Sequence, residues 1–291
     1  MRRAGMQKSR SDVVVFLGPT MTEAAATQRL DAVYLPPAAQ GAFVRAVADY
    51  RPRAILLIDG TFQGEPAVRH KEILWALSQG VAVYGAASMG ALRAAELHTH
   101  GMVGVGLIYR WYRRFPLAPD DAVAVLHGPP EIGSPALTSA LVDLRLTFRA
   151  AERAGRITRD LRLRLDQTAA ELNFRERTLR QVTASRVDGL VGTDRNDMLL
   201  LETVLVQSFV HQKRRDAEAA LDLVASDLRA GIDRGQPVGG RQFVLTSAFL
   251  RDLADAGLSL PKGQGPEPVF SCGPFASMLS VSGPGAVDVS S

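Results

Sequence analysis

The first half of the chain alternates between short apolar runs and segments with helical spacing, and this alternation constrains the fold more than any other feature. The apolar runs are Val13–Leu17, Ala54–Ile58, Val81–Tyr84 and Ala122–Leu126, with Ala32–Leu35 as a candidate fifth. Helical patterns lie between them, near Thr22–Leu30, Ala38–Tyr50, Pro66–Ser78 and Gly90–His98. Alternating β and α units predict a mostly parallel sheet with flanking helices. Continuous apolar runs agree, because strands buried on both faces need not alternate with polar residues.

The second half has a different character. Apolar residues recur at helical spacing from Leu137 to Phe148, and the same spacing continues through later segments. The later helices are predicted at Thr158–Leu172, Glu176–Ala184, Asp194–Lys213, Asp216–Ala230 and Arg241–Ala256. We therefore predict an α/β fold followed by an α-helical C-terminal region. The predicted division is a flexible tail at 1–12, an α/β core at 13–134, a helical domain or extension at 135–256, and a flexible Pro-, Gly- and Ser-rich tail at 257–291.

Composition restricts the class of protein. The chain has 291 residues and 46% hydrophobic content, which suffices for a sizeable core. No apolar run approaches the roughly 18 residues of a membrane-spanning helix, and the basic N-terminus lacks the apolar segment of a secretory signal. The lone cysteine, Cys272, argues against an internal disulfide and a cysteine metal cluster. We expect a cytoplasmic protein that needs neither a membrane nor a metal.

Positive charge is concentrated in one stretch. The formal net charge is only +4, but ten arginines and five acidic residues lie between Arg149 and Arg186. The ordinary interpretation is a solvated helical face. A second hypothesis is that this stretch docks an acidic protein or peptide. RNA binding is a weaker hypothesis, since aromatic residues are scarce there and Phe148 and Phe174 fit a core. We therefore do not expect a nucleic-acid partner.

The segment Gly85–Leu97, GAASMGALRAAEL, has the layout of a strand, a tight turn, a serine and a helix. That layout presents a nucleophile to solvent in α/β hydrolases, which makes Ser88 the candidate nucleophile. Ala86 stands where such turns usually have glycine. The alternative is that Ser88 merely caps the helix that follows.

A serine hydroxyl needs a base, and two histidines are candidates for the general base. His70 lies early in a predicted helix, and His127 ends the predicted strand Ala122–Leu126. Asp59 follows the run Ala54–Ile58, at the carboxyl end where parallel sheets place their ligand sites, and is a candidate to orient His70. Lys71 would permit a Ser–Lys variant, although a solvated charge is the simpler interpretation.

Further residues are candidates for binding the substrate. Gly18, Pro19 and Thr20 follow the first strand, and N–H groups of this loop could form an oxyanion hole with that of Met89, beside Gly90. Arg93 is a candidate for binding an anionic C-terminus. Gly101–Gly106 fits no dinucleotide fingerprint and is predicted to be a loop, no phosphate-loop motif occurs, and no cofactor is expected.

Five segments in order carry a resemblance to a known family: FLGPTMT (16–22), IDGTFQGEPAVRHKEIL (58–74), YGAASMGALRAAEL (84–97), HGMVGVGLIYRWYR (100–113) and DDAVAVLHG (120–128). Together they resemble the TfuA-like protein family over roughly Val13 to Leu146. The resemblance implies a partner of a YcaO-type enzyme that installs thioamides in a peptide or protein. It also implies sulfur supply, by hydrolysis of a thiocarboxylated ubiquitin-like sulfur-carrier protein to release sulfide.

The lone cysteine bears on that chemistry independently. A protein that holds sulfur as a persulfide needs a reactive core thiol, whereas Cys272 lies in the Gly- and Pro-rich tail. Release of sulfur by a hydroxyl nucleophile such as Ser88 fits better. The alternative function is a non-catalytic docking or allosteric partner of the YcaO enzyme.

Overall fold

A computed structural model describes residues 12–62, 64–129, 133–184, 195–231, 243–260 and 269–270. Its main sheet has five parallel strands in the order β2-β1-β3-β4-β5. The strands are β1 (Val13–Phe16), β2 (Val33–Leu35), β3 (Ala54–Leu57), β4 (Ala82–Ala86) and β5 (Val103–Val105). The all-parallel sheet confirms the predicted α/β class. The strand order changes direction between β1 and β3, and doubly wound sheets bind ligands at such a switch point.

One strand prediction and one loop prediction were wrong. The run Ala122–Leu126 forms no strand, because it begins at the end of the short helix η2 (Asp120–Ala122) and continues as a loop. Val123 and Ala124 are apolar because this loop is buried, and a short apolar run cannot distinguish a buried loop from a strand. Conversely, β5 lies within the glycine-rich segment predicted to be a loop, and it pairs with β4 from Tyr84 to Ala86.

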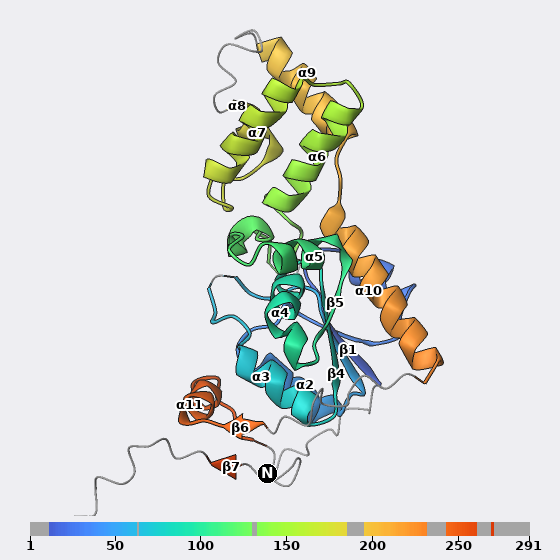
Figure 1. Ribbon diagram of the computed structural model, residues 1–291, viewed down its shortest axis with the longest axis vertical. Coiled ribbons are helices and arrows are strands. Elements are labelled where there is room, and N and C mark those ends of the chain that lie inside the picture. Colours follow the sequence, from blue (N-terminus) through green and yellow to red (C-terminus); the bar gives the residue numbers. More distant parts are fainter. Residues whose placement is uncertain are drawn as a thin grey trace, which may run out of the picture.

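Helices cover both faces of the sheet (Figure 1). One face packs against α2 (Ala42–Tyr50), α3 (His70–Ser78) and α4 (Met89–Leu97), and α5 (Gly106–Arg114) packs beside α4. The other face packs against α10 (Gln212–Arg229) and the segment of α1 (Glu23–Thr27). Alternate residues of each strand therefore serve different layers: Val14 and Phe16 face the first group of helices, and Val13 and Val15 face α10.

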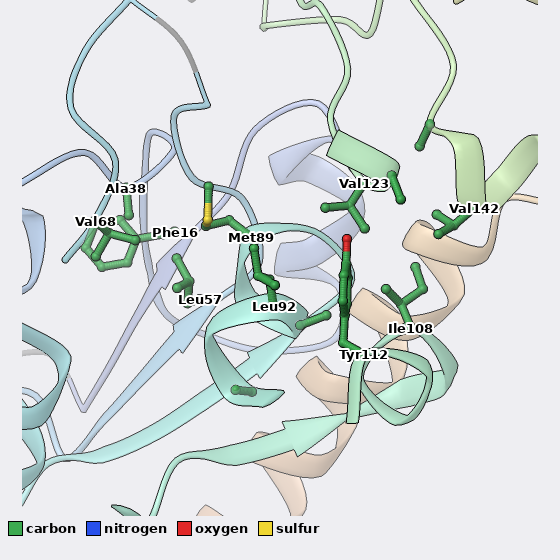
Figure 2. Packing of buried hydrophobic residues seen from close by; sticks show 14 of the residues in the cluster. Phe16, Ala38, Leu57, Val68, Met89, Leu92, Ile108, Tyr112, Val123 and Val142 are labelled. Carbon is green, nitrogen blue, oxygen red and sulfur yellow. The ribbon is translucent and has the colours of Figure 1, made fainter. Parts of the chain in front are cut away.

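Above the sheet lies a helical lobe, which we define as α6 to α9 (Figure 1). Its helices are α6 (Leu141–Arg153), α7 (Arg159–Glu171), α8 (Leu179–Ala184) and α9 (Arg195–Gln207). They confirm the predicted helical C-terminal region. Apolar packing continues from the lobe into the core, and Figure 2 shows Val142 of α6 close to Ile108 and Tyr112 of α5.

The remaining described elements are short. They are η1 (His98–His100), β6 (Val244–Leu245), α11 (Ser247–Asp255) and β7 (Val269–Phe270), of which β6 and β7 pair in parallel. The segment that carries α11 contacts the core, where Gln40 Nε2 donates to the carbonyl of Asp252 at 2.6 Å and Arg45 donates to that of Ala256 at 2.7 Å.

Buried carboxylates join α10 to its neighbours. Asp216 accepts the backbone N–H groups of Leu107 and Ile108 at 3.0 and 2.7 Å, and so caps α5. Asp143 of α6 accepts the N–H groups of Gln212 and Lys213 at 3.0 and 3.2 Å, and so caps α10. Burial raises the pKa of Asp143 to about 6, although Lys213 opposes this. These bonds satisfy helix N–H groups that have no partner within their own helix.

The predicted boundary at residue 134 assigns α10 to the helical region, whereas α10 covers one face of the core sheet. The domain division therefore stays a prediction. Residues 1–11 of the predicted N-terminal tail and most of the predicted C-terminal tail, Cys272 included, lie outside the described residues. In the described part of the chain, no helix combines the length and the apolar character that crossing a membrane requires.

Candidate functional site

The turn that carries Ser88 is tight and strained. The N–H of Ser88 donates to the carbonyl of Ala86 at 2.8 Å, across Ala87, whose φ is 65°. A bond from residue i to i+2 around a positive φ is a γ-turn of the strained kind, and a non-glycine residue rarely adopts that φ. Strain of this kind occurs at functional sites where the surrounding structure enforces it. The turn leads from the end of β4 to the start of α4 within two residues.

The hydroxyl of Ser88 is not used to cap α4. Ser88 occupies the N-cap position, but its side chain makes no capping hydrogen bond. Among the described residues, no hydrogen bond to this hydroxyl is found, and the residue is 8% exposed. The capping interpretation therefore does not account for the serine, and its hydroxyl is available for a ligand.

Glycines bring this turn close to β3. A Cβ atom on Gly90 would lie 1.8 Å from the carbonyl oxygen of Leu57, so only glycine fits there. The N–H of Gly90 donates to the carbonyl of Ile58 at 3.2 Å, which ties α4 to the end of β3. Met89 is buried beside Leu57 and Leu92 (Figure 2) and anchors the turn in the core. Ser88 is thus placed next to the residues that follow β3.

Asp59 lies at the switch point and holds the loop after β1. It is 2% exposed, and its Oδ2 accepts the N–H groups of Gly18 and Thr20 at 2.9 and 3.1 Å. Its Oδ1 accepts the hydroxyl of Thr20 at 2.6 Å. The two N–H groups predicted to bind an oxyanion are therefore donated to Asp59, and Pro19 between them has no N–H. His70, which Asp59 was predicted to orient, is not among the partners of Asp59.

A cavity of about 250 Å³ brings several predicted residues together. Ser88, Asp59 and His127 all line it, together with Pro19 and Met89. The rest of its wall is mostly apolar, with Gly60, Phe62, Phe174 and the loop residues 123–126. The carboxyl ends of β1, β3 and β4 therefore meet at one hollow, as the position of Asp59 predicted.

A backbone contact orients the ring of His127. Its Nδ1 lies 2.9 Å from the carbonyl oxygen of Gly128. A carbonyl can only accept, so in the neutral ring this contact assigns the proton to Nδ1 and the lone pair to Nε2. A neutral imidazole with a free Nε2 can accept a proton from a hydroxyl. The ring lies on a loop rather than at the predicted strand end, and its segment makes an isolated bridge to Ala136.

His70 and Arg93 lie in a different cluster, outside the lining of this cavity. His70 Nε2 and Arg93 Nη1 both lie 2.7 Å from Glu96 Oε2, between α3 and α4. Burial acts to raise the pKa of Glu96, but the hydrogen bonds from His70 and Arg93 outweigh it and lower that pKa. Lys71 contacts the backbone of β6 instead, with its Nζ 3.4 Å from the carbonyl oxygen of Val244. The structure thus brings His127, rather than His70 or Lys71, to the cavity of Ser88.

Sequence reasoning missed the part of the cavity that comes from the helical side. Phe174, after α7, packs edge to face on Phe62 with ring centroids 5.5 Å apart. Arg177 is 1% exposed and donates to Asp121 Oδ2 at 2.8 Å and to the carbonyl of Leu172 at 2.9 Å. It fastens the segment of Phe174 to the loop that leads to His127. Arg177 lies in the arginine-rich stretch, so no signal distinguished it from a surface charge.

The loop of the cavity wall is also held from α10. Lys213 is buried, and its Nζ donates to the carbonyl of Val123 at 2.9 Å. Asp143 lies close enough for its pKa to be lowered by this ammonium group. Within the described part of the chain, no group of three or more His, Cys, Asp or Glu side chains could hold a metal ion.

The fold and this cavity define an α/β protein of the doubly wound kind, with a serine that lines a cavity at the carboxyl ends of its strands. Residues 59–178 match the family model described as TfuA-like protein. The resemblance predicted from the motifs is thus confirmed over this segment. The matched segment contains Asp59, Ser88, His127 and Phe174, so it includes most of the cavity.

No curated protein gives a significant match to the chain. At the level of the family, the TfuA-like match supports an accessory role linked to thioamidation, in general association with YcaO-type enzymes.

Proposed function

We propose that this chain hydrolyses the thiocarboxylated C-terminus of a ubiquitin-like sulfur-carrier protein and so supplies sulfide to a YcaO-type enzyme. The observation that carries the proposal is the shared cavity of Ser88 and His127. Ser88 presents an uncapped hydroxyl on a strained turn, and the neutral tautomer of His127 that donates to Gly128 carries its lone pair on Nε2. Acyl transfer by a serine requires a base for the hydroxyl proton, and the imidazole of His127 lines the same cavity as Ser88.

In the proposed reaction, Ser88 Oγ attacks the carbonyl carbon of the thiocarboxylate while His127 Nε2 accepts the hydroxyl proton. The tetrahedral intermediate collapses, the C–S bond breaks, and sulfur leaves as hydrosulfide, HS⁻, with the proton returned by His127. Water, deprotonated by His127, then attacks the ester on Ser88, which restores the hydroxyl and releases the carrier carboxylate. The sum is thioacid plus water to carboxylic acid plus hydrogen sulfide, so no oxidant or reductant is needed.

The developing oxyanion has one natural donor. The N–H of Met89 is the first of α4, so it has no acceptor within the helix, and the helix dipole favours negative charge there. In this proposal Asp59 keeps the loop of Gly18 and Thr20 in place, and Phe62 with Phe174 limits the entry of water.

The test is sulfide release from a thiocarboxylated carrier, measured with purified variants. We expect Ser88→Ala to lower the rate by about a thousandfold or more, since nucleophile removal leaves only binding and oxyanion stabilisation. We expect His127→Gln to lower it by about a hundredfold or more, as for loss of a general base. His70→Gln is the matched control and should stay within about threefold. Equal rates for wild type and Ser88→Ala would refute the proposal.

A second experiment distinguishes the proposed hydrolysis from the docking alternative. In a reconstituted thioamidation reaction supplied with free sulfide, Ser88→Ala should support product formation as well as wild type does. If the chain acts only by docking, Ser88→Ala would also match wild type when the thiocarboxylated carrier is the sole sulfur source.

A further inference from the structure

A second, larger hollow lies on the helical side of the molecule and belongs to no part of the proposed chemistry. It is a groove of about 580 Å³ between α5, α6 and α7. It shares no lining residue with the cavity of Ser88. We call it the helical groove.

The walls of the helical groove are mainly apolar. Leu107, Ile108 and Trp111 come from α5, Val142 and Leu146 from α6, and Leu163 from α7. Two of these side chains are unusually exposed, since Leu107 is 40% and Leu163 is 48% accessible to solvent. Clustered exposed apolar side chains with a polar rim mark interaction sites rather than ordinary surface.

The polar rim of the groove is positively charged. Arg145 and Arg149 of α6 line it, one helical turn apart. In the described part of the chain neither has an ion pair with a carboxylate, although both are close enough to lower the pKa of Asp166, which burial raises overall. Arg162 differs, because it is already held by Glu152 and Asp166. Two guanidinium groups beside an apolar floor therefore remain open to an acidic ligand.

The form of the groove indicates the form of its ligand. Each wall presents residues three or four apart on one helix, as with Leu107 and Trp111, Val142 and Leu146, and Leu163 and Gln167. Three helix faces that converge in this way leave a slot for a fourth helix. The side-chain ridges of that helix would fit the grooves of the three walls. Helix-in-groove recognition uses such i, i+3 and i+4 contacts.

We propose that the helical groove binds an amphipathic helix of a partner protein, one whose apolar face is flanked by glutamate or aspartate. The apolar face would cover Leu107, Trp111 and Leu163, and the acidic flank would pair with Arg145 and Arg149. This site is independent of Ser88 and stands even if the chain has no hydrolase activity.

The probe is a pair of fluorescein-labelled 18-residue peptides, measured by anisotropy against the full-length protein. Both have leucines at i, i+3, i+4 and i+7, and their flanking residues are all glutamate in one and all lysine in the other. We expect the acidic peptide to bind about tenfold or more tightly than the basic one, with a preference that weakens as salt increases.

Variants locate the binding. Arg145→Glu with Arg149→Glu should weaken the acidic peptide by about tenfold or more and reverse the charge preference. Leu163→Asp should weaken both peptides by a similar factor, because it places a charge against the apolar face. The matched controls are Leu117→Asp, a leucine 99% exposed elsewhere, and Arg251→Glu on α11. Both controls should bind like wild type.

Three outcomes would overturn the proposal. One is equal binding of the acidic and basic peptides, or binding that the groove variants leave unchanged. A second is a dimer in sedimentation analysis that Leu163→Asp separates into monomers, which would assign the groove to a second copy of the chain. A third is stoichiometric displacement of the peptide by decanoate at micromolar concentration, which would assign it to a small amphiphile.

Discussion

The α/β core and the helical lobe secure their polar groups in different ways. In the core, buried carboxylates accept backbone N–H groups: Asp59 holds the loop after β1, Glu72 holds Gly41, Phe43 and Arg69, and Asp216 caps α5. Within the helical lobe, Arg162 instead pairs with the side chains of Glu152 and Asp166, and the carboxylate that accepts backbone N–H groups, Asp143, lies where α6 meets α10.

The difference follows from what each region must position. A carboxylate that accepts two or three N–H groups fixes the backbone of a loop, and the core uses such loops to place Ser88 and the residues around it. An ion pair between side chains fixes two helices without specifying the loop between them. The core therefore suits a site that needs accurate geometry, and the lobe suits a surface for a partner.

Two glycines provide the strongest test of this contrast. Gly90→Ala should destabilise the fold by about 4 kcal/mol or prevent folding, since its Cβ would lie 1.8 Å from a backbone oxygen. Gly155→Ala in the lobe meets no atom within 4 Å, so its cost is that of a positive φ of 67°, about 1 kcal/mol. Urea unfolding measures both. Similar losses for the two variants would contradict the view that the core is the more tightly packed region.

Two aspartates on α10 compare a buried cap with a surface ion pair. Asp216→Ala should lower the free energy of unfolding by about 3 kcal/mol, because two buried N–H groups of α5 lose their acceptor. Asp222→Ala removes a surface partner of Arg29 that is 57% exposed, and should cost under about 0.5 kcal/mol. Thermal and urea unfolding give both values. An equal cost for the two would show that capping by Asp216 is unimportant.

The buried glutamate of the core should make stability depend on pH. Burial raises the pKa of Glu72 to about 7, even though the N–H groups of Arg69, Gly41 and Phe43 act to lower it. The folded state thus keeps this proton to a higher pH than the unfolded chain, whose glutamate has the ordinary value of 4.5. This contribution is fully present below about 4.5 and is lost as the pH rises through about 7.

Glu72→Gln removes that titration. The substitution should lower the free energy of unfolding by about 1–2 kcal/mol at pH 5, because the amide accepts fewer N–H bonds than the carboxyl group does. The difference from wild type should shrink by pH 8. The measurement is urea unfolding across this range, with the exposed Glu65→Gln as the control. A slope between pH 5 and 8 that is the same in wild type and Glu72→Gln would contradict the assigned pKa.

A small effect is expected for the ion pairs of the lobe. Arg162→Met keeps most of the apolar stem but removes both ion pairs, and should cost about 1 kcal/mol or less. The loss should fall further at high salt. A cost above that of Asp216→Ala would reverse the comparison between the two regions.

Much of the fold could be predicted from the sequence, because apolar runs and helical spacing record burial directly. β1, β3 and β4 and the helices after them appear where the pattern placed them. The pattern failed for the loop after η2, which is apolar because it covers a cavity, and for β5, where Gly104 leaves room for the ring of Tyr109. The pattern also gave no sign that Glu72 is buried, because the N–H groups of Gly41 and Phe43 that it accepts come from the start of another helix.

The candidate site was predictable in part. Ser88, Asp59 and His127 each follow a segment of apolar residues, and all three line one cavity. What the sequence could not provide was the pairing between distant residues. The partners of Asp59 lie about 40 positions earlier, and Arg177 reaches Asp121 from 56 positions away. A preference between His70 and His127 depends on such contacts.

The position of α10 has a consequence for how the chain folds during synthesis. All five strands have been made once Val105 emerges, but the helix that shields their second face ends at Arg229. Until then Val13, Val15 and Leu56, which pack in the same apolar cluster as α10, lack the cover of this helix. The helical lobe is translated in this interval, so its local contacts can form first. The sheet forms its contacts with α10 later, because α10 is distant from the strands in the sequence. Completion of the core is therefore a late event, set by synthesis of the C-terminal part.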